Sequence, residues 1–253
     1  MGFSHAANEA IIECYQQGIM TTVEIMPVTP WFPEVVKLCN ENPELDVGIH
    51  LALTSEWTNL KWRPLTTAPS LTDDNGYFYP MISPNANYGN AYALSKQNWQ
   101  LAEIEKEIRA QIELSIKNIP HISHVSSHMG FTSMNPKIQD MVRQLAKEYK
   151  IDIDLGEHNV EWFWFNGPRS TAEEKIETFI KQLSTLEPGK TYMFLEHPAY
   201  DTPEVQAIHH IGYEDVAKDR QGVTELWTDD RVKKAIKQKG IKLITYAELL
   251  SGK

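Results

Sequence analysis

The 253-residue sequence has little cysteine and no long apolar run. Its two cysteines, Cys14 and Cys39, are too few for a disulfide framework or a thiolate metal site. Both fall in predicted helices, where a buried cysteine packs as a small hydrophobe. No segment approaches the roughly 20 apolar residues that a membrane-spanning helix needs. No signal peptide is recognisable. We therefore expect no membrane contact and a cytoplasmic location.

Positive charge is also scarce. Lysine and arginine together number 24 against 34 aspartates and glutamates, which gives a formal net charge of -10. The densest basic stretch, residues 233–239, is predicted to be the solvated face of a helix. An acidic chain without basic runs is a poor partner for nucleic acid or anionic lipid. What remains is an ordinary globular composition, 42% hydrophobic, which is enough to bury a sizeable core.

Short apolar runs alternate with amphipathic stretches along the chain. Strands are predicted at 21–26, 45–53, 124–127, 151–155, 191–196 and 241–245. Helices are predicted at 6–18, 33–42, 99–118, 136–149, 170–186 and 229–239, followed by a last turn at 246–250. Such alternation indicates a largely parallel sheet, because parallel neighbours need a crossover helix. The predicted fold class is therefore α/β, and a barrel is the economical closure.

The alternation fails at about residues 58–98, which are rich in Pro, Asn, Thr and Tyr. A connection of that length is far beyond the usual roughly 4–6 residues. We expect one domain over residues 1–253, with this segment as a long loop insertion. In α/β barrels such insertions usually lie on the functional face.

Three histidines fall at or just past the ends of predicted strands: His50, His128 and His197. Parallel α/β sheets place their active sites at these ends, so the three side chains are expected to converge. Neutral imidazole is the commonest metal ligand in proteins. His124 would project to the same side as His128 and can support it. The tryptophans of the predicted loops, Trp57, Trp62, Trp162 and Trp164, admit two readings, packing at the rim of the core or stacking on sugar rings.

Four stretches together resemble one family: MGFSHAANEAI, GIHLALTSEW, SHVSSHMG and EHPAY. Their order and spacing are similar to those of the YdjC-like (ChbG/HpnK-type) carbohydrate deacetylases. The resemblance implies a deviant (β/α) TIM-like barrel that removes an N-acetyl group from a small acetylated amino sugar. It also implies a divalent metal ion, with Zn or Mg expected. Amide hydrolysis suits such a site, because a metal activates water and polarises the acetyl oxygen.

The resemblance also implies roles for individual residues. His50 and His128 match the two metal-binding histidines, and His197 matches a histidine expected to act as general acid or transition-state stabiliser. Substrate contacts are expected from Glu56, Trp57 and Arg220. Supporting positions are expected at Gly2, His5, Asn8 and His124, with His5 as a partial substitute for a missing ligand.

The sequence departs from the family pattern in ways that bear on activity. The family opens with a strand ending in Asp-Asp, and that pair would fall just before Met1, so the first strand and both carboxylates are absent from the sequence as given. Ser126 stands where many members have aspartate, Thr132 where many have histidine, and Val223 where many have aspartate. We expect impaired activity for the chain as given, and a homodimer if a strand edge is left open. The alternative is a non-catalytic member that binds carbohydrate.

Overall fold

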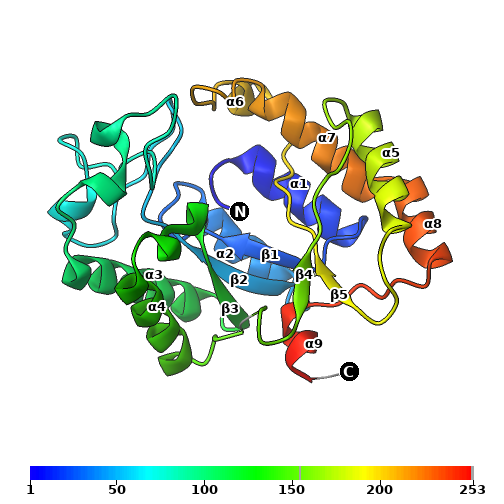
Figure 1. Ribbon diagram of the computed structural model, residues 1–253, viewed down its shortest axis with the longest axis horizontal. Coiled ribbons are helices and arrows are strands. Elements are labelled where there is room, and N and C mark those ends of the chain that lie inside the picture. Colours follow the sequence, from blue (N-terminus) through cyan, green and yellow to red (C-terminus); the bar gives the residue numbers. More distant parts are fainter. Residues whose placement is uncertain (154, 252–253) are drawn as a thin grey trace.

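Two small parallel sheets form the centre of the fold. The computed structural model describes residues 1–153 and 155–251 (Figure 1). One sheet has the order β1 (Thr22–Ile25), β2 (Asp46–Leu51), β3 (Ile122–Ser127), and the other pairs β4 (Val160–Trp162) with β5 (Thr191–Met193). All these pairings are parallel, which confirms the predicted α/β class. No strand pairing within the described residues joins the two sheets, so the TIM-like closure is not confirmed.

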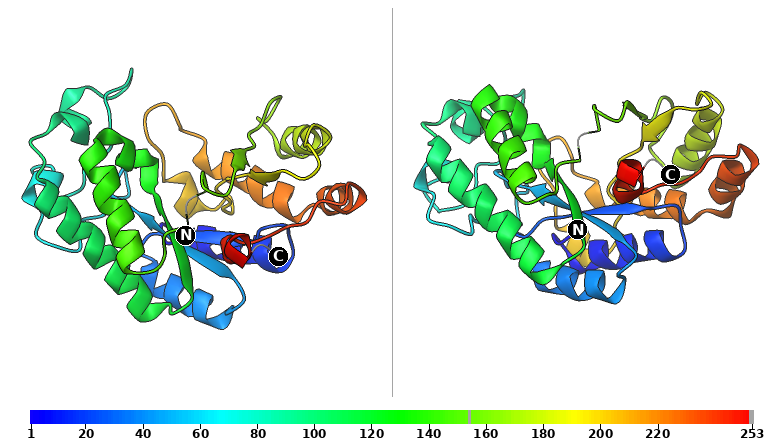
Figure 2. Two further views of the ribbon diagram at one scale, coloured as in Figure 1. Left: turned by 60° about the horizontal axis from the view of Figure 1, so that its bottom comes forward. Right: turned by 90° about the horizontal axis from the view of Figure 1, so that it is seen from below.

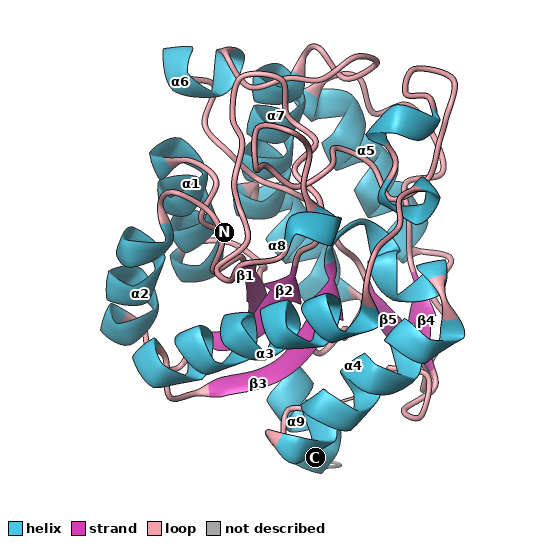
Figure 3. Ribbon diagram, turned by 90° about the vertical axis from the view of Figure 1, so that its left-hand side faces the viewer, coloured by secondary structure: helices cyan, strands magenta, loops and turns pink. Residues whose placement is uncertain are grey.

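Helices surround the two sheets. Their bounds are α1 (His5–Gln16), α2 (Phe32–Glu41), α3 (Leu101–Asn118), α4 (Pro136–Glu148), α5 (Ala172–Leu183), α6 (Pro203–Gln206), α7 (Val216–Thr228), α8 (Asp230–Gln238) and α9 (Tyr246–Ser251). In Figure 2, α3 and α4 run along one side of the molecule, and α5, α7 and α8 gather on the other. Figure 3 places α9 below β3, at the foot of the sheet. No helix in the described part of the chain is both long and apolar enough to cross a membrane.

The helix boundaries follow local chemistry. The Ser4 hydroxyl accepts a hydrogen bond from the backbone of Ala7 and begins α1. Asn135 caps α4 and proline follows at the first helical position, as predicted from the sequence. Thr171 and Glu174 form a reciprocal capping box at the start of α5. These caps satisfy backbone N–H groups that the first helical turn leaves without partners.

The three-stranded sheet has one apolar and one polar face. Successive side chains of a strand point to opposite faces. Val23, Ile25, Val47 and Ile49 are buried, and they pack into the cores beneath the helices. The alternate positions carry Glu24, Gly48, His50, His124 and Ser126. Burying a row of polar side chains in a sheet costs free energy unless the groups are paired. This polar face therefore carries the candidate site residues.

The sequence prediction was wrong for several elements. Residues 241–245 form no strand, because no neighbouring strand edge pairs with this short apolar run. The predicted strand at 151–155 includes residue 154, which lies outside the described residues, and 151–153 have no strand structure. Among the strands and α-helices of the described residues, β4, α6 and α7 were missed. In α7, Gly222 interrupts the apolar pattern, and a Cβ there would lie 3.0 Å from the Lys175 side chain of α5.

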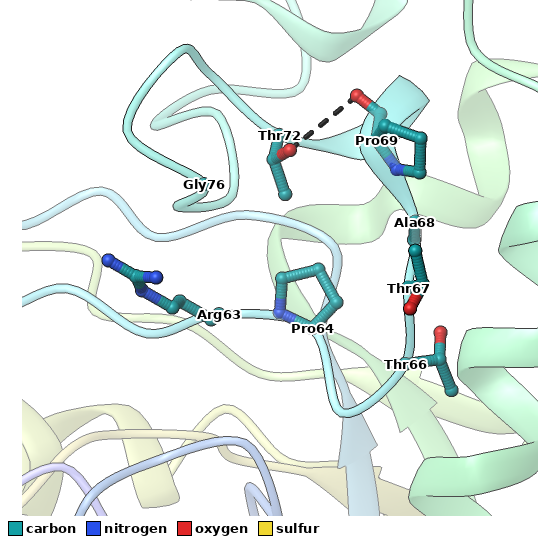
Figure 4. A pocket seen from close by; sticks show the side chains of 8 residues that line it. All are labelled: Arg63, Pro64, Thr66, Thr67, Ala68, Pro69, Thr72 and Gly76. Carbon is teal, nitrogen blue, oxygen red and sulfur yellow. Dashed lines mark hydrogen bonds between the residues drawn. The ribbon is translucent and has the colours of Figure 1, made fainter.

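The long insertion between β2 and α3 is packed rather than loose. It includes the short 3-10 helices η1 (Pro69–Leu71), η2 (Asn90–Tyr92) and η3 (Leu94–Lys96). Leu71, Phe78 and Leu94 are fully buried and anchor it to the core. The insertion encloses a cavity of about 250 Å³ beside Arg63 and Pro64, where the Thr72 hydroxyl donates to the Pro69 carbonyl (Figure 4). All the residues that line it belong to the insertion, and none of them is a predicted site residue, so it is not the candidate site.

The first residues lie beside β1. The Met1 amino group donates to the carbonyl of Glu24 at 2.7 Å, and the amide of Met26 donates to the carbonyl of Met1 at 3.1 Å. This is the hydrogen-bond pattern of a parallel neighbour. Gly2 follows with φ of +112°, and a Cβ there would lie 2.2 Å from the Thr29 hydroxyl oxygen. Only glycine fits this turn.

Candidate functional site

His50 and His128 lie together at the C-terminal edge of the three-stranded sheet. His50 is near the end of β2, opposite Ser126 of β3, and His128 directly follows β3. Their ring centroids are 5.2 Å apart, with planes at 76°. His197 follows β5 and lies close enough for its protonated form to lower the pKa of His50, and a protonated His128 would likewise lower the pKa of His197. The three strand-end histidines predicted from the sequence therefore lie near one another.

Each of the two neighbouring histidines has one ring nitrogen held by a polar partner. His50 Nδ1 lies 2.6 Å from the Ser126 hydroxyl oxygen, and His128 Nε2 lies 2.9 Å from Glu56 Oε2. No hydrogen bond in the described part of the chain engages the other nitrogen of either ring. Both side chains are partly exposed, at 20% and 13%. One lone pair on each imidazole is thus available to a ligand.

The surroundings keep His50 and His197 uncharged. Burial lowers the pKa of His50 to about 3, and repulsion from His128 is the second cause. The pKa of His197 is lowered as well, first by the protein around it and then by the Arg220 guanidinium. Burial tends to raise the pKa of Glu56, but His128, a backbone hydrogen bond and Arg220 together leave this pKa below its usual range. Neutral imidazoles beside an ionised carboxylate are what metal binding and proton transfer require.

Glu24 is a site residue that the sequence reasoning missed. Its Oε1 lies 2.7 Å from His124 Nε2, and its Oε2 accepts a hydrogen bond of 2.5 Å from Ser126. The second oxygen is also 3.9 Å from His50 Nδ1. Burial acts to raise the pKa of Glu24, but His124, His50 and the Ser126 hydrogen bond together lower it. The available signal was a charged residue inside the apolar run TTVEIM, where a partner is obligatory.

Gly48 makes the contact between Glu24 and His124 possible. The three residues share one row of the sheet, with Gly48 in the middle. A Cβ on Gly48 would lie 2.3 Å from His124 Nε2, so the fully buried His124 ring occupies the space of the absent side chain. Tyr246 of α9 stacks on this ring at 3.5 Å and 5°. The contact that His124 Nε2 makes is with Glu24, not with His128, so a supporting role for His124 would act through Glu24.

The opening loop is fixed by α2. The side chain of Asn8 accepts from the Gly2 amide at 2.8 Å and donates to Glu34 Oε2 at 2.8 Å. His5 Nδ1 lies 2.7 Å from Glu34 Oε1, and its Nε2 lies 3.3 Å from Glu9. The hydrogen bond to Glu34 raises the pKa of His5. Because both ring nitrogens of His5 face carboxylates, its geometry does not favour the expected substitution for a missing ligand.

The residues expected to bind substrate occupy different surroundings. Trp57 is only 4% exposed, and its ring packs between Phe3 and His210. The guanidinium of buried Arg220 lies 4.7 Å above the Phe3 ring and 5.2 Å above the Trp57 ring, and its Nε has no partner within the described residues. Glu56 is the partner of His128 rather than an open group.

The other tryptophans divide between core packing and an exposed aromatic surface. Trp62 is buried and donates to the Thr54 carbonyl, so it belongs to the core. Trp162 and Trp164 are 51% and 55% exposed, and their rings stack at 5.0 Å with planes 6° apart. Packing therefore accounts for Trp57 and Trp62, whereas the second pair presents an open aromatic surface.

A polar cavity of about 410 Å³ lies next to the elements that carry His197 and Arg220. Its lining is rich in charge of both signs and comprises Arg169, Ser170, Lys175, Glu196, Tyr213, Asp215, Lys218 and Asp219. Tyr213 also contacts the Trp57 ring at 6.2 Å. The volume falls within the range of about 300–1,000 Å³ that small-molecule sites occupy.

His50 and His128 are suitable ligands for a divalent metal ion, but two ligands are fewer than such a site needs. His50 and His128 each have one ring nitrogen held, by a hydroxyl and a carboxylate respectively, which is the support that metal-binding histidines usually have. Catalytic zinc sites take about three protein ligands. Over residues 1–153 and 155–251, no group of three or more His, Cys, Asp or Glu side chains is placed to hold a metal ion. The described residues thus offer two candidate ligands, fewer than a catalytic metal site needs.

Comparison with known proteins agrees with the arrangement of these motifs. The YdjC-like protein family matches residues 1–238. A carbohydrate deacetylase of Geobacillus stearothermophilus is 29% identical over 259 residues, covering 98% of this chain and 94% of that protein. A carbohydrate deacetylase of Enterococcus faecalis is 25% identical over 264 residues, covering 98% and 94% respectively.

A solved structure shares the fold. It is a protein of Enterococcus faecalis V583 whose name assigns it to cellobiose-phosphate cleavage, and it superimposes with a TM-score of 0.75. The match covers 98% of this chain and 95% of that chain at 24% identity. The match over residues 1–238 shows the family directly. The chain belongs to the YdjC-like protein family.

Proposed function

We propose that this protein is a carbohydrate deacetylase that hydrolyses the N-acetyl group of an acetylated amino sugar. The observation that carries the proposal is the pair His50 and His128, whose rings lie 5.2 Å apart and each keep one nitrogen free. Relatives that align with nearly the whole chain are named carbohydrate deacetylases. Both points support the same reaction class, metal-assisted hydrolysis of a carbon–nitrogen bond.

In this reaction a water oxygen adds to the acetyl carbon, the carbon–nitrogen bond breaks, and acetate and a free amine leave. We propose that His50 and His128 contribute two ligands to a divalent ion, Zn or Mg. When bound, such an ion lowers the pKa of water and polarises the acetyl oxygen. Glu56 accepts from His128 Nε2 and fixes that ring. His197 has a lowered pKa and is neutral near pH 7, so its N–H can donate to the oxyanion that develops on the acetyl oxygen.

The polar cavity beside His197 and Arg220 supports a sugar as substrate. Carboxylates and cationic groups both line it, including Glu196, Asp215 and Lys218. Both kinds of group bind hydroxyls, as acceptors and donors respectively. Because charges of both signs line it, the cavity suits a neutral ligand with many hydroxyls better than an ion.

Acetate release tests the proposal. The protein is expressed with whatever residues its gene encodes before Met1 and is incubated with oligosaccharides of N-acetylglucosamine and added Zn, Mg, Co or Ni. We expect acetate and free amine in equal amounts, and at least about a 100-fold loss on changing His50→Gln or His197→Gln. His121→Gln is the matched control, because His121 lies at the opposite end of β3.

Two results would overturn the proposal. One is a folded protein that releases no acetate under any of these conditions. The other is measurable sugar affinity without turnover, which would favour the non-catalytic alternative.

A further inference from the structure

Three side chains form a continuous chain of short contacts from β1 through β3 to β2. Glu24 Oε2 lies 2.5 Å from the Ser126 hydroxyl oxygen, which lies 2.6 Å from His50 Nδ1. The direct separation of Glu24 Oε2 and His50 Nδ1 is 3.9 Å, too long for a hydrogen bond. Ser126 is thus the link between the carboxylate and the imidazole. These three residues are called the Glu24 relay.

The chemistry of the groups fixes the direction of both hydrogen bonds. An ionised carboxylate only accepts, so the single hydrogen of Ser126 points to Glu24. The Ser126 oxygen can then only accept from His50, so the hydrogen of that ring sits on Nδ1. In the neutral imidazole the lone pair is consequently on Nε2.

The support of Glu24 is itself rigid. Its other oxygen is held by His124, which is fully buried between the Gly48 backbone and the Tyr246 ring. A ring stacked at 3.5 Å covers one face of His124, so Gly48 must lie against the other. With both oxygens engaged and the histidine unable to turn, the carboxylate keeps one position relative to β2.

We propose that Glu24 is a positioning residue for His50: through Ser126 it holds the ring in the Nδ1–H tautomer and leaves Nε2 as the nitrogen that binds a ligand. Outer partners of this kind fix the tautomer and orientation of functional histidines, and their loss typically costs about 10–100-fold in ligand affinity or activity. The link to catalysis rests on the proposed deacetylase function, whereas the tautomer does not.

Nitrogen NMR of the histidine rings tests the tautomer directly. The protein is labelled with ¹⁵N-histidine, treated with a chelator and studied near pH 7.5 by long-range proton–nitrogen correlation. The His50 signals are assigned by their absence in His50→Gln. We expect a protonated Nδ1 and an unprotonated Nε2 in the wild-type protein. A wild-type His50 protonated on Nε2 instead would overturn the inference.

Variants test whether Glu24 and Ser126 cause that state. Ser126→Ala removes the link and leaves Glu24 and His124 in place, so we expect His50 to gain the Nε2–H tautomer. Ser126→Thr keeps the hydroxyl and is expected to restore Nδ1–H. Ser127→Ala is the matched control, because the Ser127 hydroxyl contacts Thr132 rather than the relay. An unchanged His50 spectrum in Ser126→Ala would overturn the inference.

Glu24→Ala tests the carboxylate itself, with Ser126→Ala as the fallback where that variant does not fold. We expect the same tautomer change, and a fall of about 10–100-fold in kcat/KM for acetate release in both variants. Normal turnover in both variants would overturn the positioning role. If the wild-type protein releases no acetate while the spectra behave as expected, the proposed function fails and the tautomer assignment stands.

Discussion

Replacing Gly48 by alanine is expected to destabilise the protein, because the added methyl group meets the His124 ring. The new Cβ would lie 2.3, 2.5 and 2.8 Å from three ring atoms. Fully buried under Tyr246, the ring has no free space into which to turn. Overpacking costs about 1–3 kcal/mol, and displacing the ring would also break a hydrogen bond to a carboxylate, worth about 1.5–3 kcal/mol. We expect a loss of about 3–5 kcal/mol in the free energy of unfolding.

Urea unfolding monitored by tryptophan fluorescence measures this loss, and a thermal melt should show a midpoint lower by roughly 10 °C or more. Gly89→Ala is the matched control, since a Cβ at Gly89 meets no atom within 4 Å. The same substitution in a His124→Ala background isolates the cause, because the clashing ring is then absent. We expect Gly48→Ala to cost less than about 1 kcal/mol there. An equal cost in both backgrounds would refute the explanation by ring clash.

Three further predictions concern pH, a buried ion pair and the insertion. The pKa of His50 is about 3 in the folded protein and about 6.5 when unfolded, so the unfolded chain binds more protons between these values and stability falls as pH decreases. Urea unfolding at pH 7, 6 and 5 gives the free energy of unfolding at each pH. In His50→Gln this free energy should change less with pH, by up to about 1.4 kcal/mol per pH unit, and an equal pH dependence in both proteins would contradict the assignment. Lys175→Ala leaves Asp219, at 36% exposure, without its cationic partner at 2.6 Å, although the Tyr213 hydroxyl still donates to it. We expect a loss of about 2 kcal/mol, below the roughly 3–5 of a fully buried pair, and recovery of part of it with Asp219→Asn; no recovery would count against the pair. Phe78→Ala should cost about 3–5 kcal/mol because Phe78 is fully buried. Tyr92→Ala, at 55% exposure, should cost under about 1 kcal/mol, and similar losses for both would show that the insertion does not share the core.

The sequence predicted those features that depend on local pattern. The alternation of strands and helices indicated parallel pairing, and Asn135 before Pro136 marked the start of α4. His50 and His128 could be placed together because the ends of neighbouring parallel strands share one edge of a sheet. Each of these inferences needs only the order of the residues and the strand or helix period.

Features that depend on register could not be predicted. Glu24 meets His124 across Gly48 only because the three residues share one row, and a shift of one residue would turn Glu24 to the opposite face. Barrel closure likewise depends on which strand edges meet. The strand predicted at 241–245 found no neighbour, and the two sheets remain three-stranded and two-stranded over the described residues.

Mass spectrometry of the reaction products tests the central claim most directly. The protein is expressed with whatever residues its gene encodes before Met1, and this wild-type protein and its His50→Gln variant are incubated with oligosaccharides of N-acetylglucosamine and a divalent metal. We predict that the wild-type protein converts the sugar to a form lacking one acetyl group, with an equal amount of acetate, and that His50→Gln does so at least about 100-fold more slowly. Intact sugar after incubation with the folded wild-type protein, or equal conversion by His50→Gln, would contradict the account.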